Sequence, residues 1–272
     1  MANTLSVPAP SSGLWRHRHL VAQLVRRDVV GRYRGSFLGV FWSLFNPLLS
    51  LAVYTFAFGV VFKTRWIGSE AGGLLEFAVM LFAGLIVFAV FSECVTRAPG
   101  VVLANPNFVK KIVFPLEVLP VMLLGSALFH ATASFAVLVV GVAITYGSIP
   151  WTFLLFPLVL VPVALLSLGL AWILASLGVF VRDIAQAISI LTSALLFLSP
   201  IFYPLSALPP SVRPWIALNP IAFPIEQARD VLVLGNLPDW AVLAAYSAGG
   251  LLIAMVGYWW FRRTKRAFAD VM

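Results

Sequence analysis

From Val118 to Val181 the chain runs for 64 residues without an aspartate, glutamate, lysine or arginine. A helix needs about 20 apolar residues to cross a bilayer, so this block is long enough for two crossings. The turn-forming residues Thr145 to Pro150 lie near its middle and divide it. The whole chain is 61% hydrophobic and only 10% charged, whereas soluble domains are about 25% charged. The sequence therefore predicts a polytopic membrane protein.

Further uncharged blocks precede and follow this one. Together they predict an all-α protein with six transmembrane helices, at residues 36–62, 77–96, 119–145, 151–180, 184–205 and 240–261. Asp183, directly before the fifth span, is a predicted N-cap. Residues 1–13 are small and polar with two prolines, which indicates a disordered lead-in. Residues 262–272 form a basic tail.

The distribution of cations predicts the orientation in the membrane. With six spans, 14 of the 18 lysines and arginines lie on the side of the two termini. Cytoplasmic loops carry the excess of Lys and Arg, so both termini are expected in the cytoplasm and the spans in the inner (plasma) membrane. This rule also accounts for the formal charge of +8, so no nucleic-acid partner is expected.

Residues 14–35 have the pattern of an amphipathic helix. Its basic residues, expected at the membrane interface, are Arg26, Arg27, Arg32 and Arg34. This helix either anchors the topology or acts as a lever that contacts a cytoplasmic partner. Asp28 falls on its apolar side and requires a polar partner.

Residues 206–238 are expected on the outer face. Prolines are too dense around this segment for a regular helix, so short re-entrant or interfacial helices are predicted. Trp215 and Phe223 are either parts of an outer gate or aromatic interface anchors.

Motifs for chemistry are missing from the sequence. A phosphate-binding GxxxxGK[ST] loop does not occur, so this chain is not itself a P-loop ATPase. HExxH, GxSxG and Cys/His metal clusters are also absent, and neither catalytic residues nor a metal are predicted. His130 lies inside the third span, where bonding to a neighbouring helix is favoured over a proton relay.

Three stretches resemble ABC-2 type permeases that export polysaccharides. The first is RRDVVGRYRGSFLGVFWSLFNPLL, in which the matching positions are Arg32, Tyr33, Arg34, Ser36, Leu38, Gly39, Trp42 and Pro47. The second runs from Phe82 to Pro120, and the third is SPIFYPLSALP followed by NPIAFPIEQARDVLVLG. The resemblance covers nearly all of the chain after Leu14.

This resemblance implies a permease that forms a homodimer with two ATPase subunits. It moves lipid-linked polysaccharide across the inner membrane, with O-antigen (rather than capsule or teichoic acid) as the favoured substrate. ATP and Mg²⁺ are bound by the partner ATPase, and this chain holds no cofactor.

The resemblance also suggests which residues line the path, because aromatic faces stack on sugar rings. The candidates are Trp42, Phe45, Tyr54 and Phe58 in span one and Phe197, Phe202 and Tyr203 in span five. Alternatively, these side chains pack against helices or lipid.

Residues 97–117 are the expected coupling loop to the ATPase. Its candidate contacts are Asn105, Phe108, Lys110 and Lys111, although the two lysines also fit ordinary topology signals. At the loop's ends, Glu93 and Arg97 have the i, i+4 spacing of a helical ion pair. Glu117 requires a cation, for which Arg34 is the candidate.

Two other functions remain open at this point. One is an ABC-2 permease for a small amphiphile such as a drug or haem. The other is a membrane-embedded lipid-modifying enzyme, for which Glu226, Arg229 and Asp230 are the nearest to a reactive cluster.

Overall fold

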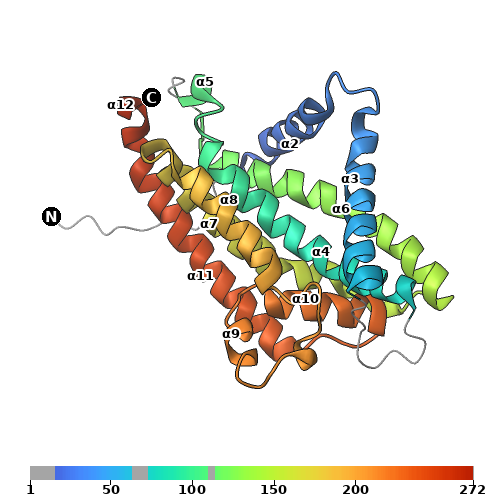
Figure 1. The fold of residues 1–272 in the computed structure, drawn as a ribbon. Helices are drawn as coiled ribbons and strands as arrows, with labels where there is room; N and C mark the ends of the chain where they lie inside the picture. The colour runs from blue at the N-terminus through green and yellow to red at the C-terminus, as the bar shows by residue number, and fades with distance from the viewer. Residues whose placement is uncertain (1–15, 63–72, 110–113, 272) are drawn as a thin grey trace.

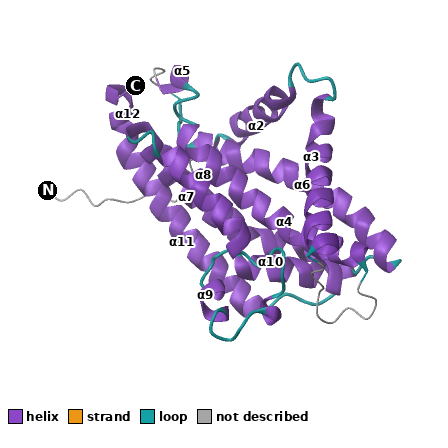
Figure 2. Cartoon of the chain, viewed as in Figure 1, coloured by secondary structure: helices purple, strands orange, loops and turns teal. Residues whose placement is uncertain are grey.

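The computed structural model describes residues 16–62, 73–109 and 114–271. Every regular element within these ranges is a helix (Figures 1 and 2). The α-helices are α2 (Arg18–Tyr33), α3 (Trp42–Tyr54), α4 (Leu74–Arg97), α5 (Pro106–Val109), α6 (Val118–Tyr146), α7 (Phe156–Phe180), α8 (Ile184–Leu198), α9 (Arg213–Ala217), α10 (Ala222–Arg229), α11 (Trp240–Thr264) and α12 (Phe268–Val271).

Short 3-10 and π segments extend several of these helices. The 3-10 turns are η1 (Gly39–Phe41), η3 (Ala98–Gly100), η4 (Trp151–Leu155), η5 (Leu205–Ala207) and η7 (Lys265–Ala267). The π segments are η2 (Thr55–Val61), which continues α3, and η6 (Asp230–Leu234), which continues α10. The expectation of an all-helical protein is confirmed for the described residues.

Five helical segments are long and apolar enough to cross a membrane. They are Gly39–Val61, Leu74–Gly100, Val118–Tyr146, Trp151–Phe180 and Trp240–Ala267. The expected fifth span, 184–205, is a helix only over the 15 residues of α8, about 22 Å at 1.5 Å per residue. It ends before Pro200, which cannot continue a helix. A sixth crossing at this position stays a prediction.

Asp183 occupies the N-cap position of α8, as predicted, but its side chain does not cap the helix. The Asp183 side chain accepts no capping hydrogen bond, and its backbone has φ −70° and ψ −14°. Those angles are helical, whereas a capping residue has extended angles that turn its side chain back onto the first free N–H groups.

Helix α4 forms the centre of the bundle. It packs against α6, α7, α8 and α10, and most of its apolar residues are buried. Helices α7 and α11 pack very closely, since a Cβ on Gly257 would lie 2.2 Å from the Gly169 carbonyl oxygen. Small residues allow such close approach of spanning helices.

Helix α3 stands at the edge of the bundle (Figure 1). Its chain turns sharply after α2, with Gly35 at φ +83° and Gly39 at φ +53°, values that glycine adopts without a steric penalty. Ser43 is the only residue of α3 that is buried in the described structure. The other residues of this helix are partly or fully exposed.

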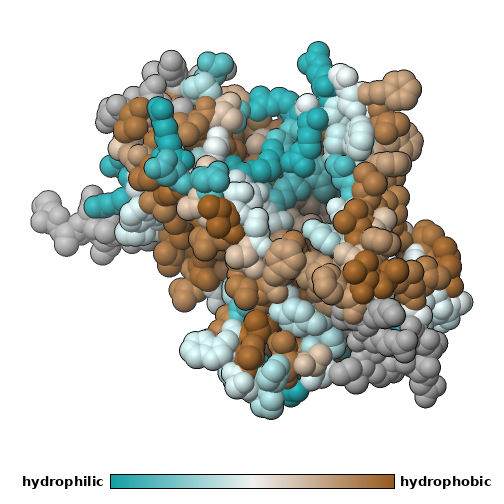
Figure 3. All heavy atoms as spheres, viewed as in Figure 1, coloured by the Kyte–Doolittle hydropathy of each residue, from teal (hydrophilic) through white to brown (hydrophobic). Residues whose placement is uncertain are grey.

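The two ends of the bundle differ. Helices α2, α5 and α12 lie at one end, called here the basic end, and α9 and α10 lie at the other, called the far end (Figure 1). Figure 3 shows hydrophilic side chains gathered at the basic end and hydrophobic ones over the middle of the molecule. This banding fits a protein that crosses a bilayer.

Candidate functional site

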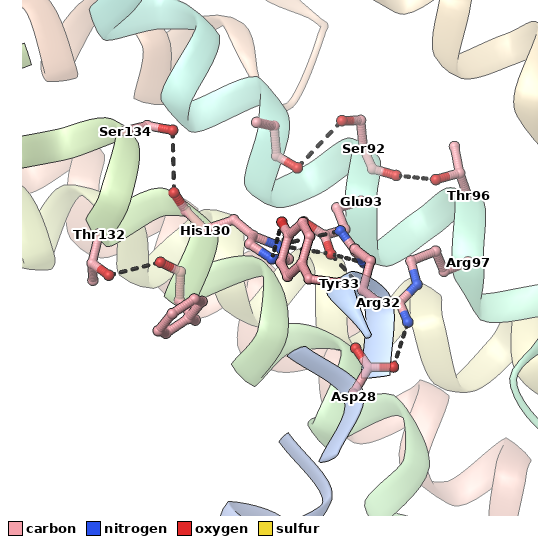
Figure 4. A network of polar contacts seen from close by, with 12 residues as sticks. Asp28, Arg32, Tyr33, Ser92, Glu93, Thr96, Arg97, His130, Thr132 and Ser134 are labelled. Carbon is pink, nitrogen blue, oxygen red and sulfur yellow. Dashed lines mark hydrogen bonds and ion pairs between the residues drawn. The ribbon is translucent and has the colours of Figure 1, made fainter. Parts of the chain in front are cut away.

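A polar network joins three helices at the basic end (Figure 4). Glu93 of α4 is at its centre and accepts from Arg32 of α2 at 2.5 Å and from Arg97 at 3.2 Å. The Glu93–Arg97 ion pair expected from the i, i+4 spacing is confirmed. His130 of α6 lies 2.9 Å from Glu93, so the carboxylate connects α2, α4 and α6.

His130 has a partner on each ring nitrogen. Its Nδ1 faces Glu93, and its Nε2 lies 3.2 Å from the Tyr33 hydroxyl. With a proton on Nδ1 the ring donates to the carboxylate, and Arg32, whose Nη1 lies 3.4 Å from the same Nδ1, then makes no hydrogen bond to the ring. His130 thus bonds to neighbouring helices, as expected for a histidine inside a span.

Asp28 obtains its polar partner from α4. Arg97 donates to its Oδ1 at 2.6 Å (Figure 4). Burial raises the pKa of Asp28, but the hydrogen bond and the charge of Arg97 outweigh it, so the pKa lies below its usual value. The acidic residue on the apolar side of α2 is therefore a fixed contact of α2 with α4.

A cleft of about 340 Å³ opens from this network along α3. Arg32, Glu93 and His130 lie at one end of it, and Tyr54 and Leu196 lie at the other. Side chains of α3, α4 and α6 form the walls. In Figure 3 the hydrophilic surface of the basic end continues downward into the hollow beside α3.

Several aromatic residues expected along the transport path come together beyond this cleft. Phe202 stacks on Phe58 at 4.2 Å between ring centroids and meets Tyr54 at 5.3 Å and Phe197 at 5.6 Å. Phe202 is buried, whereas Phe197 is exposed. The chain thus brings its first span against the segment that follows α8.

Of the other expected path residues, Trp42 and Phe45 contact each other and Tyr203 contacts the cluster through Phe197. Trp42 meets Phe45 at 5.7 Å near the start of α3, and Phe45 is exposed. The Tyr203 hydroxyl donates to the Phe197 carbonyl at 3.0 Å. The hydroxyl of Tyr203 thus has a hydrogen-bond partner in the backbone of its own segment.

The coupling loop contacts α2. Arg27 donates to the Asn105 side chain at 3.3 Å, and its guanidinium lies 5.2 Å from the centre of the Phe108 ring. Phe108 stacks on Phe114 at 4.1 Å. Arg26 and Arg34 are exposed, and Lys110 and Lys111 lie outside the described residues. The predicted interface helix and the predicted coupling loop therefore lie together and form one surface. We call this surface, which contains Arg27, Asn105 and Phe108, the α2–α5 platform.

The expected partner of Glu117 is wrong. Glu117 pairs with Lys265, and Arg262 lies 3.9 Å away, whereas Arg34 is not involved. The reason is the packing of α6, whose first turn lies beside the end of α11 rather than the end of α2. Trp172 of α7 also donates to the Glu117 backbone carbonyl at 3.0 Å.

At the far end, the two expected gate aromatics have different surroundings. Trp215 of α9 is exposed, while Phe223 of α10 stacks on Tyr246 of α11 at 4.8 Å.

Sequence reasoning missed the role of Arg229 in α10. Its side chain is buried and donates to the Met80 carbonyl at 3.1 Å, the Ile201 carbonyl at 2.8 Å and Glu226 at 2.8 Å. The available signal was a cation in the charged stretch 226–230, which apolar residues flank on both sides. Arg229 is held by Glu226 and by two backbone carbonyls, so this pair does not form an open reactive site.

Residues 19–233 match the family described as ABC-2 type transporter. The chain belongs to the ABC-2 type transporter family. The matched residues begin in α2 and end in η6, so the polar network, the cleft and the α2–α5 platform all lie within the family region.

Relatives in this family match almost end to end. An O-antigen export system permease protein of Myxococcus xanthus is 30% identical over 94% of this chain and 96% of its own length. A protein of the same name from Klebsiella pneumoniae is 27% identical over 93% of this chain and 95% of its own. A polysialic acid transport protein of Escherichia coli is 25% identical over 94% of this chain and 97% of its own length.

Proposed function

We propose that this chain is the membrane permease of an ABC exporter that moves a lipid-linked polysaccharide, with O-antigen as the favoured class, across the inner membrane. The observation that carries this is the end-to-end similarity to permeases named for O-antigen export, which covers the spans and the loops alike. The E. coli relative is named for another polysaccharide, which favours polymeric sugar over a small amphiphile. A lipid-modifying enzyme lacks support, because Glu226 of the far-end cluster is paired with Arg229 and Asp230 accepts from Gln227 and Asn236.

Energy comes from a separate ATPase in this proposal. The chain lacks a GxxxxGK[ST] loop, so ATP and Mg²⁺ belong to the partner and this chain holds no cofactor. The α2–α5 platform is the proposed docking surface. An aromatic ring with a cation over it, as Arg27 lies over Phe108, is typical of a residue that anchors an interface.

A homodimer of permeases with two ATPase subunits is the proposed assembly. Helix α3 carries polar residues on its cleft side and is almost entirely unburied in the single chain. Polar side chains facing hydrocarbon cost free energy, so a second copy that covers the cleft would remove this cost. The aromatic residues around Phe202 then lie beside a path shielded from lipid.

The proposed orientation places the basic end and both termini in the cytoplasm. This follows the excess of cations there, and Arg262 and Lys265 of the tail lie beside Glu117 at that end. In this arrangement α8 with residues 199–205 makes the sixth crossing. Helices α9 and α10 then form the outer-face segment, with Trp215 and Phe223 in the proposed gate.

A cellular complementation experiment tests the proposal. Deleting the gene should leave lipid-linked polysaccharide on the cytoplasmic side of the membrane, and the wild-type chain should restore it to the cell surface. Deleting the partner ATPase should give the same defect. Normal surface polysaccharide in the permease deletion strain would contradict the proposed function.

A further inference from the structure

Polar side chains recur along the cleft side of α3. Trp42, Asn46, Ser50 and Tyr54 are spaced four residues apart and all line the cleft. Residues i and i+4 lie above one another on a helix, so these side chains form a continuous polar wall. This wall extends along the cleft from the Glu93 network to Tyr54, which belongs to the aromatic cluster.

Two members of this wall have no partner within the described structure. Neither the Asn46 amide nor the Ser50 hydroxyl makes a side-chain hydrogen bond to another described residue, although Ser43 beside them donates to the Val40 carbonyl at 2.7 Å. Amides and hydroxyls on a spanning helix normally bond to a neighbouring helix, because hydrocarbon offers no partner. Both side chains are exposed in the single chain, so their donors and acceptors are available to a polar occupant of the cleft.

The opposite wall supplies complementary chemistry. Ser92 and Ser134 donate to backbone carbonyls of their own helices, and each hydroxyl oxygen still has a lone pair with which to accept a bond. Phe82 and Phe88 of α4 add ring surface. An occupant of the cleft thus meets donors, acceptors and aromatic carbon together.

The charges at the end of the cleft are already matched. Arg32 and Arg97 pair with Glu93 and Asp28, so two guanidinium groups face two carboxylates. An additional phosphate or carboxylate would compete with Glu93 for Arg32 and add a negative charge beside a carboxylate. The chemistry of the cleft therefore suits a neutral ligand.

We propose that this cleft binds a neutral sugar unit of the transported polymer, with Asn46 and Ser50 as its hydrogen-bonding contacts. The inference rests on the proposed function and adds a specific site to it. Hydroxyls around a sugar ring both donate and accept, which matches an amide and a serine, and the apolar face of the ring matches the phenyl groups. About 340 Å³ is at the lower end of the range for ligand pockets, so the cleft holds a single unit rather than a length of chain.

Photocrosslinking in the intact complex tests the site. The photoreactive residue p-benzoylphenylalanine is placed at position 50, or at position 48 as the control, in cells whose partner ATPase is unable to hydrolyse ATP. Leu48 is exposed on the side of α3 away from the cleft. After illumination, mass spectrometry of the crosslinked α3 peptide identifies what is attached.

The expected result is carbohydrate attached at position 50 and none at position 48. A lipid or phosphate-containing adduct at position 50 would overturn the inference, as would carbohydrate at both positions or at neither. Export by the unsubstituted complex is measured in parallel. It fails only if the proposed function is wrong, so the two failures are distinguishable.

A second variant removes the contacts themselves. Asn46→Leu combined with Ser50→Ala should lower the export rate about tenfold, since each lost hydrogen bond weakens binding several-fold. Leu48→Ala on the same helix should export at the parental rate. Rates are normalised to the permease present in the membrane, and a parental rate in the double variant would overturn the inference.

Discussion

Replacing Arg229 by alanine should strongly destabilise the far end of the protein. The guanidinium is buried and holds the carbonyls of Met80 and Ile201 together with the carboxylate of Glu226. These groups belong to α4, the segment after α8, and α10. One side chain therefore fixes the position of α10 relative to two other parts of the chain.

The magnitude follows from what remains after truncation. The Ile201 carbonyl loses its Arg229 donor, and a buried polar group left unpaired costs about 1–3 kcal/mol. The Met80 carbonyl, inside α4, loses only its second donor, because the helical hydrogen bond remains. Glu226 keeps some contact with solvent, its side chain being 29% exposed, so its unpaired charge adds less than a fully buried one. The expected loss is about 3–5 kcal/mol, the range for breaking a buried ion pair by removing one partner.

Arg213 provides a matched control. It also donates to two backbone carbonyls, those of Leu208 at 2.8 Å and Ser206 at 2.6 Å, but it is exposed. Water replaces the guanidinium there, so Arg213→Ala should cost less than about 1 kcal/mol. The comparison separates the effect of burial from the loss of an arginine.

The free energy of unfolding is measured by denaturant titration in mixed micelles, followed by the fluorescence of the nine tryptophans. Arg229→Lys is included because it retains a charge but loses the fork of donors, and it should fall between alanine and wild type. If Arg229→Ala is destabilised no more than Arg213→Ala, the role assigned to the buried guanidinium is wrong.

Three further predictions concern the packing and docking of helices. Phe108→Ala should reduce co-purification of the partner ATPase several-fold while membrane levels stay unchanged, because it removes the ring of the α2–α5 platform; undiminished co-purification would argue against docking there. Gly257→Ala should lower the melting temperature, because its Cβ would lie 2.2 Å from a carbonyl oxygen, whereas Gly249→Ala meets nothing within 4 Å and should leave the temperature unchanged or higher. The Asp28–Arg97 pair should persist on acidification to the usual Asp pKa of 3.8 and break only as the pH falls through the lower folded pKa; spin-label distances between α2 and α4 that increase already above pH 5 would contradict this.

The spans were predictable because hydrocarbon tolerates few charges, so an uncharged block indicates a crossing almost regardless of its neighbours. The Glu93–Arg97 pair was predictable for a similar reason, since i, i+4 geometry is local to one helix. The short length of α8 was harder to predict from the sequence. Prolines indicate where a helix stops, but the apolar residues beyond Pro200 continue the pattern of a span.

Contacts between helices were not predictable from one sequence. Asp28 meets Arg97 and Glu117 meets Lys265 because of how α2, α4, α6 and α11 pack, and several cations were equally plausible partners on charge alone. The polar wall of α3 left a trace in the sequence, the four-residue spacing of Asn46, Ser50 and Tyr54. Its meaning required the cleft, which depends on the rotation of α3 against α4 and α6.

A transport assay with the purified permease and ATPase, reconstituted into lipid vesicles with the cytoplasmic side outward, tests the central claim most directly. With the permease and its ATPase both present, ATP should drive lipid-linked polysaccharide into the vesicle lumen, where it becomes protected from an added glycosidase. Protection should be lost when either chain is omitted or when ATP is replaced by a non-hydrolysable analogue. ATP-dependent uptake of a small amphiphile with no protection of polysaccharide would contradict the account.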